Sequence, residues 1–187
     1  RFAADAPVFI AGSTWPPDEE LLVGLIERYP DVKFIVAPHE IDPARIEKFC
    51  ERISRPALRY TQLTPQSDLA AAGVLFVDTI GILSSVYRYG RWGYIGGGFG
   101  AGIHNTLEAA TCGLPLAFGP RYGKFREACD LVTLRGAASI ASAEELERWF
   151  AGLHDDPDAT GRSGTICKEY VLQHKGATAR IMDEICR

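Results

Sequence analysis

The sequence lacks the features of several protein classes. No apolar run among its 187 residues reaches the roughly 18 residues that a membrane-spanning helix needs, and no segment has the pattern of a signal peptide. Lysine and arginine (20) do not outnumber aspartate and glutamate (24), so the formal net charge is −4. A nucleic-acid-binding protein would carry a basic patch. These absences predict a soluble globular protein without a nucleic-acid partner.

Cysteine is sparse and is not arranged as a metal or redox motif. The five cysteines include no Cys-x-x-Cys pair: Cys50, Cys112, Cys129, Cys167 and Cys186. Their odd number and spacing favour free thiols in a reducing compartment, so we expect a cytoplasmic protein without a metal site. Cys112 and Cys129 are interpreted as core or half-buried residues rather than nucleophiles. The missing Gly-x-Ser-x-Gly elbow makes a free-standing hydrolase the least favoured enzyme class.

The composition is that of an ordinary globular domain. Hydrophobic residues make up 47% of the chain and charged residues 24%. A chain of this length buries about 70% of its unfolded surface on folding, so it needs no disulfide or metal to be stable. We expect residues 1–187 to form a single domain. Because the sequence starts at Arg1 without an initiator methionine, we also expect a fragment whose upstream part is missing.

Apolar runs alternate with amphipathic segments along the first half of the chain. Residues 7–12 and 32–37 are expected to be buried strands. A helix is expected to open at Pro16 and Pro17, with acidic residues 18–20 in its first turn, where the helix dipole favours them. A second helix is expected at residues 44–53. This β-α-β-α order predicts a parallel sheet with right-handed crossovers.

The same pattern continues to the end of the chain. Further strands are expected at residues 58–62, 73–78, 91–95 and 114–119, with weaker strand patterns at 131–134 and 137–140. Helices are expected at residues 79–89, after the turn at 120–127, after the capping box of Ser142 and Glu145, at 158–174 and at 177–186. The sequence therefore predicts an α/β fold: a doubly wound, Rossmann-like parallel sheet with C-terminal helices. Ligands of such sheets bind at the carboxyl ends of the strands.

The most informative stretch runs from residue 94 to residue 113 and predicts a strand, a glycine-rich turn and a helix. Five of the seven residues 96–102 are glycines. Glycine is entropically costly to order, so such a turn usually exists because something must approach the backbone closely. The following helix, which begins near Asn105, offers N–H groups and a positive dipole end to an anion. We therefore predict a nucleotide site, with Gly97 and Gly98 beside the phosphate and Glu108 accepting hydrogen bonds from sugar hydroxyls.

Polar residues at the other strand ends converge on the same edge of the sheet. Ser13 and Thr14 are candidates to donate to a phosphate, or else they end a strand and cap the next helix. His39 either contacts a ligand by stacking or hydrogen bonding or is a surface histidine. Asp78 either caps the helix expected near residue 80 or reaches the ligand, and Tyr122 and Lys124 either approach the pocket or lie in a solvated turn.

Two properties of the glycine-rich stretch bear on its ligand. The spacing Gly96-x-Gly98-x-x-Ala101 resembles the dinucleotide fingerprint only loosely, because that fingerprint follows the first strand and precedes an acidic residue by about 20 positions. NAD is therefore disfavoured. Glu108 lies among Leu107, Ala109 and Ala110, so we expect it on a buried helix, where an acid needs a partner.

Five segments, in order, resemble a known family. They are residues 12–14 (GST), 77–83 (VDTIGIL), 95–98 (IGGG), 104–109 (HNTLEA) and 118–120 (FGP). The C-terminal domain of 3-deoxy-D-manno-octulosonic acid (Kdo) transferases has the forms GSTH, VDTMGEL, GGS, GGHNPLEPA and FGP. The resemblance extends from about residue 8 to residue 138, and the ordered set is more specific than any of its parts.

The resemblance implies a specific function. The family has a two-domain GT-B fold and transfers Kdo from CMP-Kdo to a lipid A precursor at the cytoplasmic face of the inner membrane of Gram-negative bacteria. The transfer is inverting, metal-independent and without a cofactor. The C-terminal domain binds the donor, while the absent N-terminal domain supplies the acceptor site, the catalytic base and contact with the membrane surface. By this resemblance, Ser13, Thr14 and Asn105 lie near the donor phosphate, Glu108 holds the ribose hydroxyls and His39 faces the cytidine.

The chain departs from the family pattern at several positions. Pro38-His39-Glu40 stands where the family often has Pro-Arg-His, so an arginine contact to the nucleotide is missing or replaced. Trp15 stands where the family often has His, and Thr106 and Ala109 replace two prolines. Two alternatives therefore stay open: the donor-binding half of another GT-B enzyme that uses a UDP-sugar, and a non-enzymatic module that binds an anionic metabolite.

Overall fold

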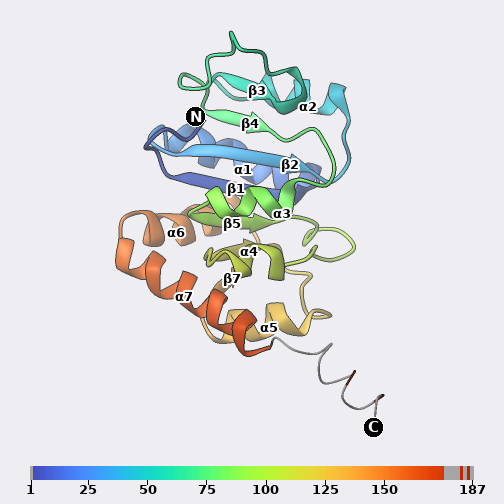
Figure 1. Cartoon of the computed structure of the whole chain (residues 1–187), viewed down its shortest axis with the longest axis vertical. Coiled ribbons are helices and arrows are strands. Elements are labelled where there is room, and N and C mark those ends of the chain that lie inside the picture. The colour runs from blue at the N-terminus through green and yellow to red at the C-terminus, as the bar shows by residue number, and fades with distance from the viewer. Residues whose placement is uncertain (1, 175–181, 183–184, 186–187) are drawn as a thin grey trace.

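The computed structural model of the chain describes residues 2–174, 182 and 185. Seven parallel strands form one sheet in the order β3-β4-β2-β1-β5-β6-β7. The strands are β1 (Val8–Thr14), β2 (Lys33–Pro38), β3 (Ala57–Arg59), β4 (Val74–Phe76), β5 (Trp92–Ile95), β6 (Leu116–Phe118) and β7 (Ala137–Ser139). The predicted parallel sheet is confirmed (Figure 1).

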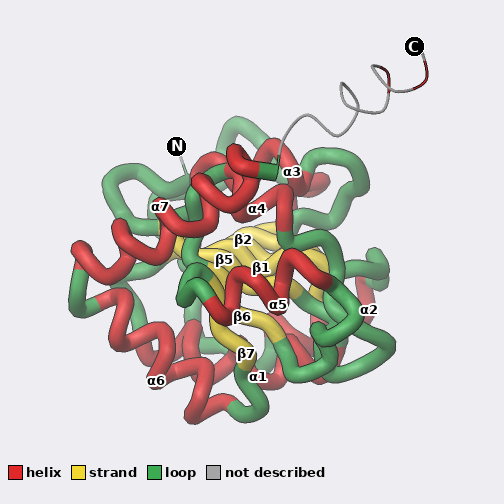
Figure 2. The backbone as a smooth tube through the Cα atoms, turned by 90° about the horizontal axis from the view of Figure 1, so that it is seen from below, coloured by secondary structure: helices red, strands yellow, loops and turns green. Residues whose placement is uncertain are grey.

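Helices cover both faces of the sheet, as a doubly wound fold requires. They are α1 (Pro16–Arg28), α2 (Pro43–Cys50), α3 (Leu83–Val86), α4 (Leu107–Thr111), α5 (Arg126–Thr133), α6 (Ala143–His154) and α7 (Pro157–Gln173), with 3-10 turns η1 (Tyr60–Gln62) and η2 (Tyr87–Tyr89). Figure 2 shows α3, α4 and α7 on one side of the sheet and α1 and α6 on the other.

Two apolar cores follow from the alternation of side chains along the strands. In β1, Val8 and Ile10 pack with residues of α4, α5 and α7, whereas Phe9 and Ala11 pack with α1, α2 and α6. Successive side chains of a strand point to opposite faces, so one buried strand supplies both cores. Phe150 of α6 packs edge-on against Phe9, with ring centroids 5.4 Å apart.

The connections place a topological switch at the centre of the sheet. From β1 the chain moves one way to β2, and it later returns to pair β5 against the other side of β1. The loops after β1 and β5 therefore diverge and leave a crevice at their carboxyl ends, where ligands of such folds bind.

Three sequence predictions need correction. The helix expected at residues 79–89 is reduced to α3 and η2, because Gly81 adopts a left-handed φ of +90° in the preceding turn. The strand expected at residues 131–134 is wrong, since these residues end helix α5 and lead out of it. In the strand expected at residues 58–62, the second half is the 3-10 turn η1.

The other predicted elements agree with the structure to within a few residues. The helix expected at residues 44–53 is α2 and ends earlier, at Cys50. Ser142 begins α6 by accepting a hydrogen bond from the Glu145 N–H at 3.3 Å, while the Glu145 carboxylate accepts from the Ala141 N–H at 2.7 Å. The helix expected at residues 177–186 lies outside the described residues.

Candidate functional site

The polar side chains at the junction between β1 and α1 hydrogen-bond to the protein itself. Ser13 has a left-handed φ of +55°, and the pairing of β1 with β2 shifts register there. The bulge brings Thr14 to the start of α1, where its buried hydroxyl donates to Glu19 Oε1 at 3.0 Å. Pro16 and Pro17 provide no N–H. The hydroxyl of Thr14 is thus directed to the helix.

Asp18 joins this junction to the glycine-rich loop. Its side chain is fully buried, and its Oδ2 accepts hydrogen bonds from the backbone N–H groups of Trp15 and Gly97, both at 2.9 Å. Its Oδ1 accepts from the Tyr94 hydroxyl at 2.7 Å. Burial and the neighbouring Asp18 charge raise the pKa of Tyr94 far above its ordinary value, so the phenol stays a donor.

Glycines are required where the loop crosses its neighbours. A Cβ on Gly96 would lie 2.1 Å from the Ser13 carbonyl oxygen, and one on Gly98 would lie 2.6 Å from the Cα of Gly119. Gly97 has a left-handed φ of +92°. The predicted close approach is therefore real, but these approaches are of one backbone to another.

A pocket of about 380 Å³ opens between the glycine-rich loop and the start of α1. It lies at the switch point, as the doubly wound topology predicts. The residues that line it are Trp15, Pro17, Asp18, Gly97, Phe99, Gly100, Ala101, Gly102 and His104.

Three rings stack at the rim of this pocket. The indole N–H of Trp15 donates to His104 Nε2 at 3.1 Å, and the exposed His39 ring stacks on both, with centroids 4.8 Å from Trp15 and 4.2 Å from His104. Desolvation and His39 lower the pKa of His104. Both the hydrogen bond and the lowered pKa favour a neutral His104 with its proton on Nδ1.

Asn105 and Glu108, on either side of the start of α4, are exposed. Asn105 Oδ1 accepts the Leu107 N–H at 2.9 Å, and Asn105 Nδ2 donates to Glu108 Oε1 at 3.0 Å. The prediction that Glu108 lies on a buried surface is wrong: the helix has only five residues and buries Ala109 and Ala110 on its other side. Glu108 is accessible to a ligand.

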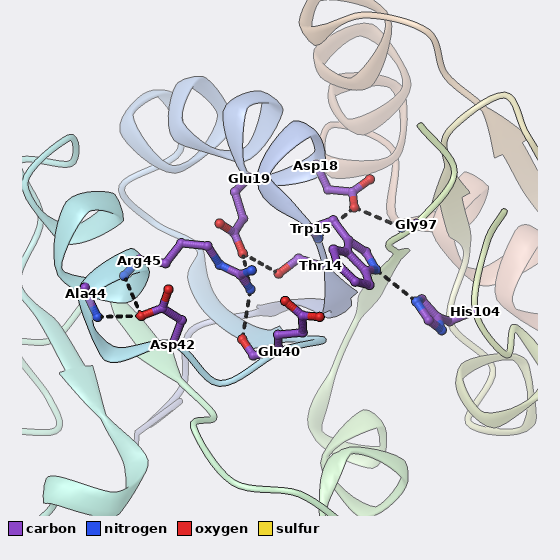
Figure 3. A network of polar contacts seen from close by, with 10 residues as sticks. All are labelled: Thr14, Trp15, Asp18, Glu19, Glu40, Asp42, Ala44, Arg45, Gly97 and His104. Carbon is purple, nitrogen blue, oxygen red and sulfur yellow. Dashed lines mark hydrogen bonds and ion pairs between the residues drawn. The ribbon is translucent and has the colours of Figure 1, made fainter. Parts of the chain in front are cut away.

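A buried ion pair supports the loop after β2 (Figure 3). The Arg45 guanidinium lies 3.5 Å from Glu19 Oε1, and its Nη2 donates to the Glu40 carbonyl at 2.9 Å. Asp42 caps α2 by accepting from the N–H groups of Ala44 and Arg45. Burial raises the pKa of Glu19 in spite of Arg45. The pair connects α1 to the segment that carries His39.

The remaining predicted residues lie farther from the pocket or are engaged elsewhere. The Asp78 carboxylate accepts from Arg59 Nε at 2.9 Å and from the Thr61 N–H and hydroxyl at 2.8 and 2.6 Å. The prediction that it caps a helix is wrong. Tyr122 is half-buried against Phe118, and exposed Lys124 borders a separate hollow of about 310 Å³ that includes Arg121.

Neither a metal-ligating cluster nor a membrane-spanning helix occurs among the described residues. In that part of the chain no group of three or more His, Cys, Asp or Glu side chains is placed to hold a metal ion. None of the helices described is long and apolar enough to cross a membrane. Cys112, expected to be core or half-buried, is exposed at the end of α4.

Sequence reasoning missed Asp18, Glu19 and Arg45. The acids were interpreted only as first-turn residues that the helix dipole favours, yet Asp18 and Glu19 are 1% and 5% exposed and bind other segments. A signal was available: both lie at helical spacing from Leu22 and Ile26 and so share their buried face. Arg45 had no such signal, because the partners of its side chain, Glu19 and the Glu40 carbonyl, come from two other segments.

The chain is similar in sequence to 3-deoxy-D-manno-octulosonic acid transferases. It is 30% identical over 184 residues to the one from Rickettsia bellii, covering 95% of this chain and 43% of that protein. It is 25% identical over 182 residues to the one from Chlamydophila psittaci, covering 96% of this chain and 41% of that protein. The predicted resemblance is confirmed, and the chain spans less than half the length of these relatives. No family model matches it.

The fold is similar to that of a solved domain. The C-terminal CMP-Kdo binding domain of WaaA from Acinetobacter baumannii superposes with a TM-score of 0.79, at 23% identity and over 92% of each chain. The predicted architecture, a Rossmann-like half of a GT-B fold, is therefore confirmed.

Proposed function

We propose that this chain is the donor-binding domain of a Kdo transferase, which moves Kdo from CMP-Kdo to a lipid A precursor. The observation that carries the proposal is the sequence similarity to Kdo transferases along 95% of the chain. The pocket at the switch point gives the donor a place to bind. Residues 1–187 form the single donor-binding domain in this proposal.

The nucleoside is proposed to lie over α4 and the ring stack. Glu108 is exposed and held by Asn105, so its second oxygen is directed to the ribose hydroxyls. His39 is exposed and stacks on both Trp15 and His104, and we assign its accessible ring surface to cytosine. Ser13 and Gly98 are placed nearest the phosphate, whereas Thr14 and Gly97 already donate to Glu19 and Asp18 and shape the site.

Two exposed cations support a transfer that needs no metal ion. Arg121, whose Nη1 donates to the Gly100 carbonyl at 2.8 Å, and Lys124 border the same hollow beside the loop. Guanidinium and ammonium groups neutralise the developing charge of a leaving phosphate as a metal ion does. Tyr122 lies between them in the chain, whereas Asp78 follows β4 on the other side of β1 and holds that loop through Arg59 and Thr61.

The rest of the reaction is assigned to a part of the protein outside this chain. We propose that an N-terminal domain binds the lipid A precursor, supplies the base for an inverting displacement and contacts the cytoplasmic face of the bacterial inner membrane. The chain alone is then expected to bind the donor nucleotide without turning it over.

Calorimetry of the chain with CMP, CTP, UMP and inorganic phosphate tests the proposal. We expect CMP and CTP to bind more tightly than UMP. Absence of cytidine nucleotide binding at millimolar concentration overturns the proposal. A preference for UMP would indicate the donor half of a UDP-sugar enzyme, and equal competition by phosphate would indicate a module for anionic metabolites.

A further inference from the structure

We propose that Asp18 is a positioning residue for the donor site: through Tyr94 and Gly97 it holds the glycine-rich loop in the conformation that accepts the donor. The inference rests on the proposed function for the identity of the ligand. Asp18 touches no substrate in this proposal and acts only through the groups that it holds.

The contacts of Asp18 join three segments that are far apart in the chain. The Trp15 N–H belongs to the start of α1, Tyr94 to β5, and the Gly97 N–H to the loop. All three are donors, so an ionised carboxylate satisfies them with its two oxygens. An amide in the same place would lose the negative charge that strengthens the two backbone bonds, and its NH₂ group would face the Tyr94 hydroxyl, which would have to turn its proton away in order to accept.

The loop conformation beyond Gly97 depends on this contact. The Gly97 carbonyl accepts from the N–H groups of Gly100 and Gly102 at 2.9 and 3.3 Å, which closes the turn. Gly97 has a left-handed φ and no side chain that would restrict its backbone. Its two peptide planes are therefore held by their hydrogen bonds, from the N–H to Asp18 and to the carbonyl from Gly100 and Gly102. Releasing the Gly97 N–H therefore frees the segment that lines the pocket.

The same carboxylate also orients the ring stack. It anchors the Trp15 backbone, and the Trp15 side chain donates to His104. The first turn of α1 has no free N–H group for an anion. Pro16 and Pro17 have no N–H, and the N–H groups of Asp18 and Glu19 donate to the Trp15 carbonyl. This end of α1 therefore serves the protein and not an anion.

The chain contains a matched control for the hydrogen bond between Tyr94 and Asp18. On α7, the hydroxyl of Tyr170 donates to Asp130 Oδ2 at 2.8 Å, against 2.7 Å at Tyr94. Both tyrosines are buried, and only Tyr94 lies beside the loop. Tyr94→Phe and Tyr170→Phe thus remove the same chemical contact at the site and away from it.

The test combines NMR spectroscopy of the free chain with CMP calorimetry. We expect Asp18→Asn and Tyr94→Phe to shift the Gly97 amide and Trp15 indole signals and to speed exchange of the Gly97 amide by about tenfold or more. We expect Asp18→Asn to weaken CMP binding by about tenfold, the factor that one hydrogen bond to a charged group represents. Tyr170→Phe should leave both signals and the affinity unchanged.

Each outcome bears on one proposal. If the wild-type chain binds no cytidine nucleotide, the proposed function fails, and the NMR signals still decide whether Asp18 positions the loop. If Tyr94→Phe folds and leaves the Gly97 amide as protected as in wild type, the inference is overturned. Equal loss of CMP affinity in Tyr94→Phe and Tyr170→Phe would also overturn it, because the effect would then follow stability and not position.

Discussion

The two strand-to-helix junctions at the centre of the sheet are built in opposite ways. After β1, the polar groups are buried and hydrogen-bonded within the protein. Thr14 donates to Glu19, and Asp18 accepts from the N–H groups of Trp15 and Gly97. After β5, Asn105 and Glu108 are exposed and begin a helix of only five residues. One junction is closed on itself, and the other presents its polar groups to solvent.

The difference shows how a site can be both rigid and accessible. A binding site is effective when its contact groups are held in place by a supporting layer with its own satisfied hydrogen bonds. In the proposed site, the support comes from the junction after β1, while the contacts come from the junction after β5. Asp18 links the two, since its carboxylate belongs to the first and binds the loop of the second.

The largest effect is expected from a change that forces the two junctions apart. Gly96→Ala places a Cβ 2.1 Å from the Ser13 carbonyl oxygen, a backbone atom that cannot move away cheaply. We expect the free energy of unfolding to fall by about 3 kcal/mol or more, measured by urea denaturation. Gly100→Ala in the same loop is the control, because its Cβ meets nothing closer than 3.6 Å. Equal stability of the two variants would contradict the packing described.

Asp78 extends the comparison to a third junction, which is also closed. Burial favours the neutral acid, but hydrogen bonds from Thr61 and Arg59 outweigh it and hold the pKa of Asp78 below its ordinary 3.8. Because the folded pKa is the lower one, the stabilisation is complete above the unfolded value and is lost as pH falls through the folded pKa.

Asp78→Asn should therefore lower the free energy of unfolding at neutral pH by about 2–3 kcal/mol. The gap to wild type should narrow as the pH falls below 3.8, the ordinary pKa of the carboxyl. Urea denaturation at a series of pH values measures this, with exposed Asp5→Asn as the control. If the difference in free energy of unfolding between wild type and Asp78→Asn does not change with pH, the charge of Asp78 does not contribute to stability.

The open junction is tested by its exposed acid. Glu108→Ala should weaken CMP binding by about 1–2 kcal/mol, because a charged acceptor for the ribose hydroxyls is lost. The melting temperature of the Glu108→Ala variant should differ little from that of the wild type, since the Glu108 side chain is exposed. Calorimetry and thermal denaturation separate the two effects. Glu169→Ala, an exposed acid on α7, should change neither, and an unaltered CMP affinity in Glu108→Ala would place Glu108 outside the site.

The smallest expected effect concerns a buried hydroxyl at the start of α4. Thr106 is fully buried, and its Oγ1 has no hydrogen-bond partner among the described residues. Thr106→Val should raise the free energy of unfolding by about 1 kcal/mol by removing an unsatisfied polar group. Thr160→Val should do the opposite, because the Thr160 hydroxyl donates to Leu153 and accepts from Trp92. Destabilisation by both changes would show that Thr106 has a partner.

The fold was predictable because its signals are local. Apolar runs rich in β-branched and aromatic residues, such as residues 32–37, favour buried strands, and their alternation with helices leaves few topologies. The failures also have local causes. Gly81 interrupts the helix expected at residues 79–89, and the apolar run at 131–134 is too short for its period to separate strand from helix.

The candidate site was predictable only in part, because its key contacts join distant segments. The glycine-rich loop and the closeness of the strand ends follow from the sequence and the topology. The stack of Trp15, His39 and His104 does not, since it combines three loops. The exposure of Glu108 does not follow either, because its neighbours are apolar, and only the fold shows that α4 buries Ala109 and Ala110 and leaves Glu108 exposed.

The position of β1 in the sheet has a consequence for the order of folding. Phe9 pairs with Phe34 on one side and with Trp92 on the other, so its two partners lie at very different distances along the chain. Closing the longer loop costs more entropy and requires more of the chain to be present. During synthesis β1 and β2 can meet early, while the second edge of β1 stays unpaired until β5 has left the ribosome. The crevice at the switch point, which needs both edges of β1, then forms only after β5 has paired.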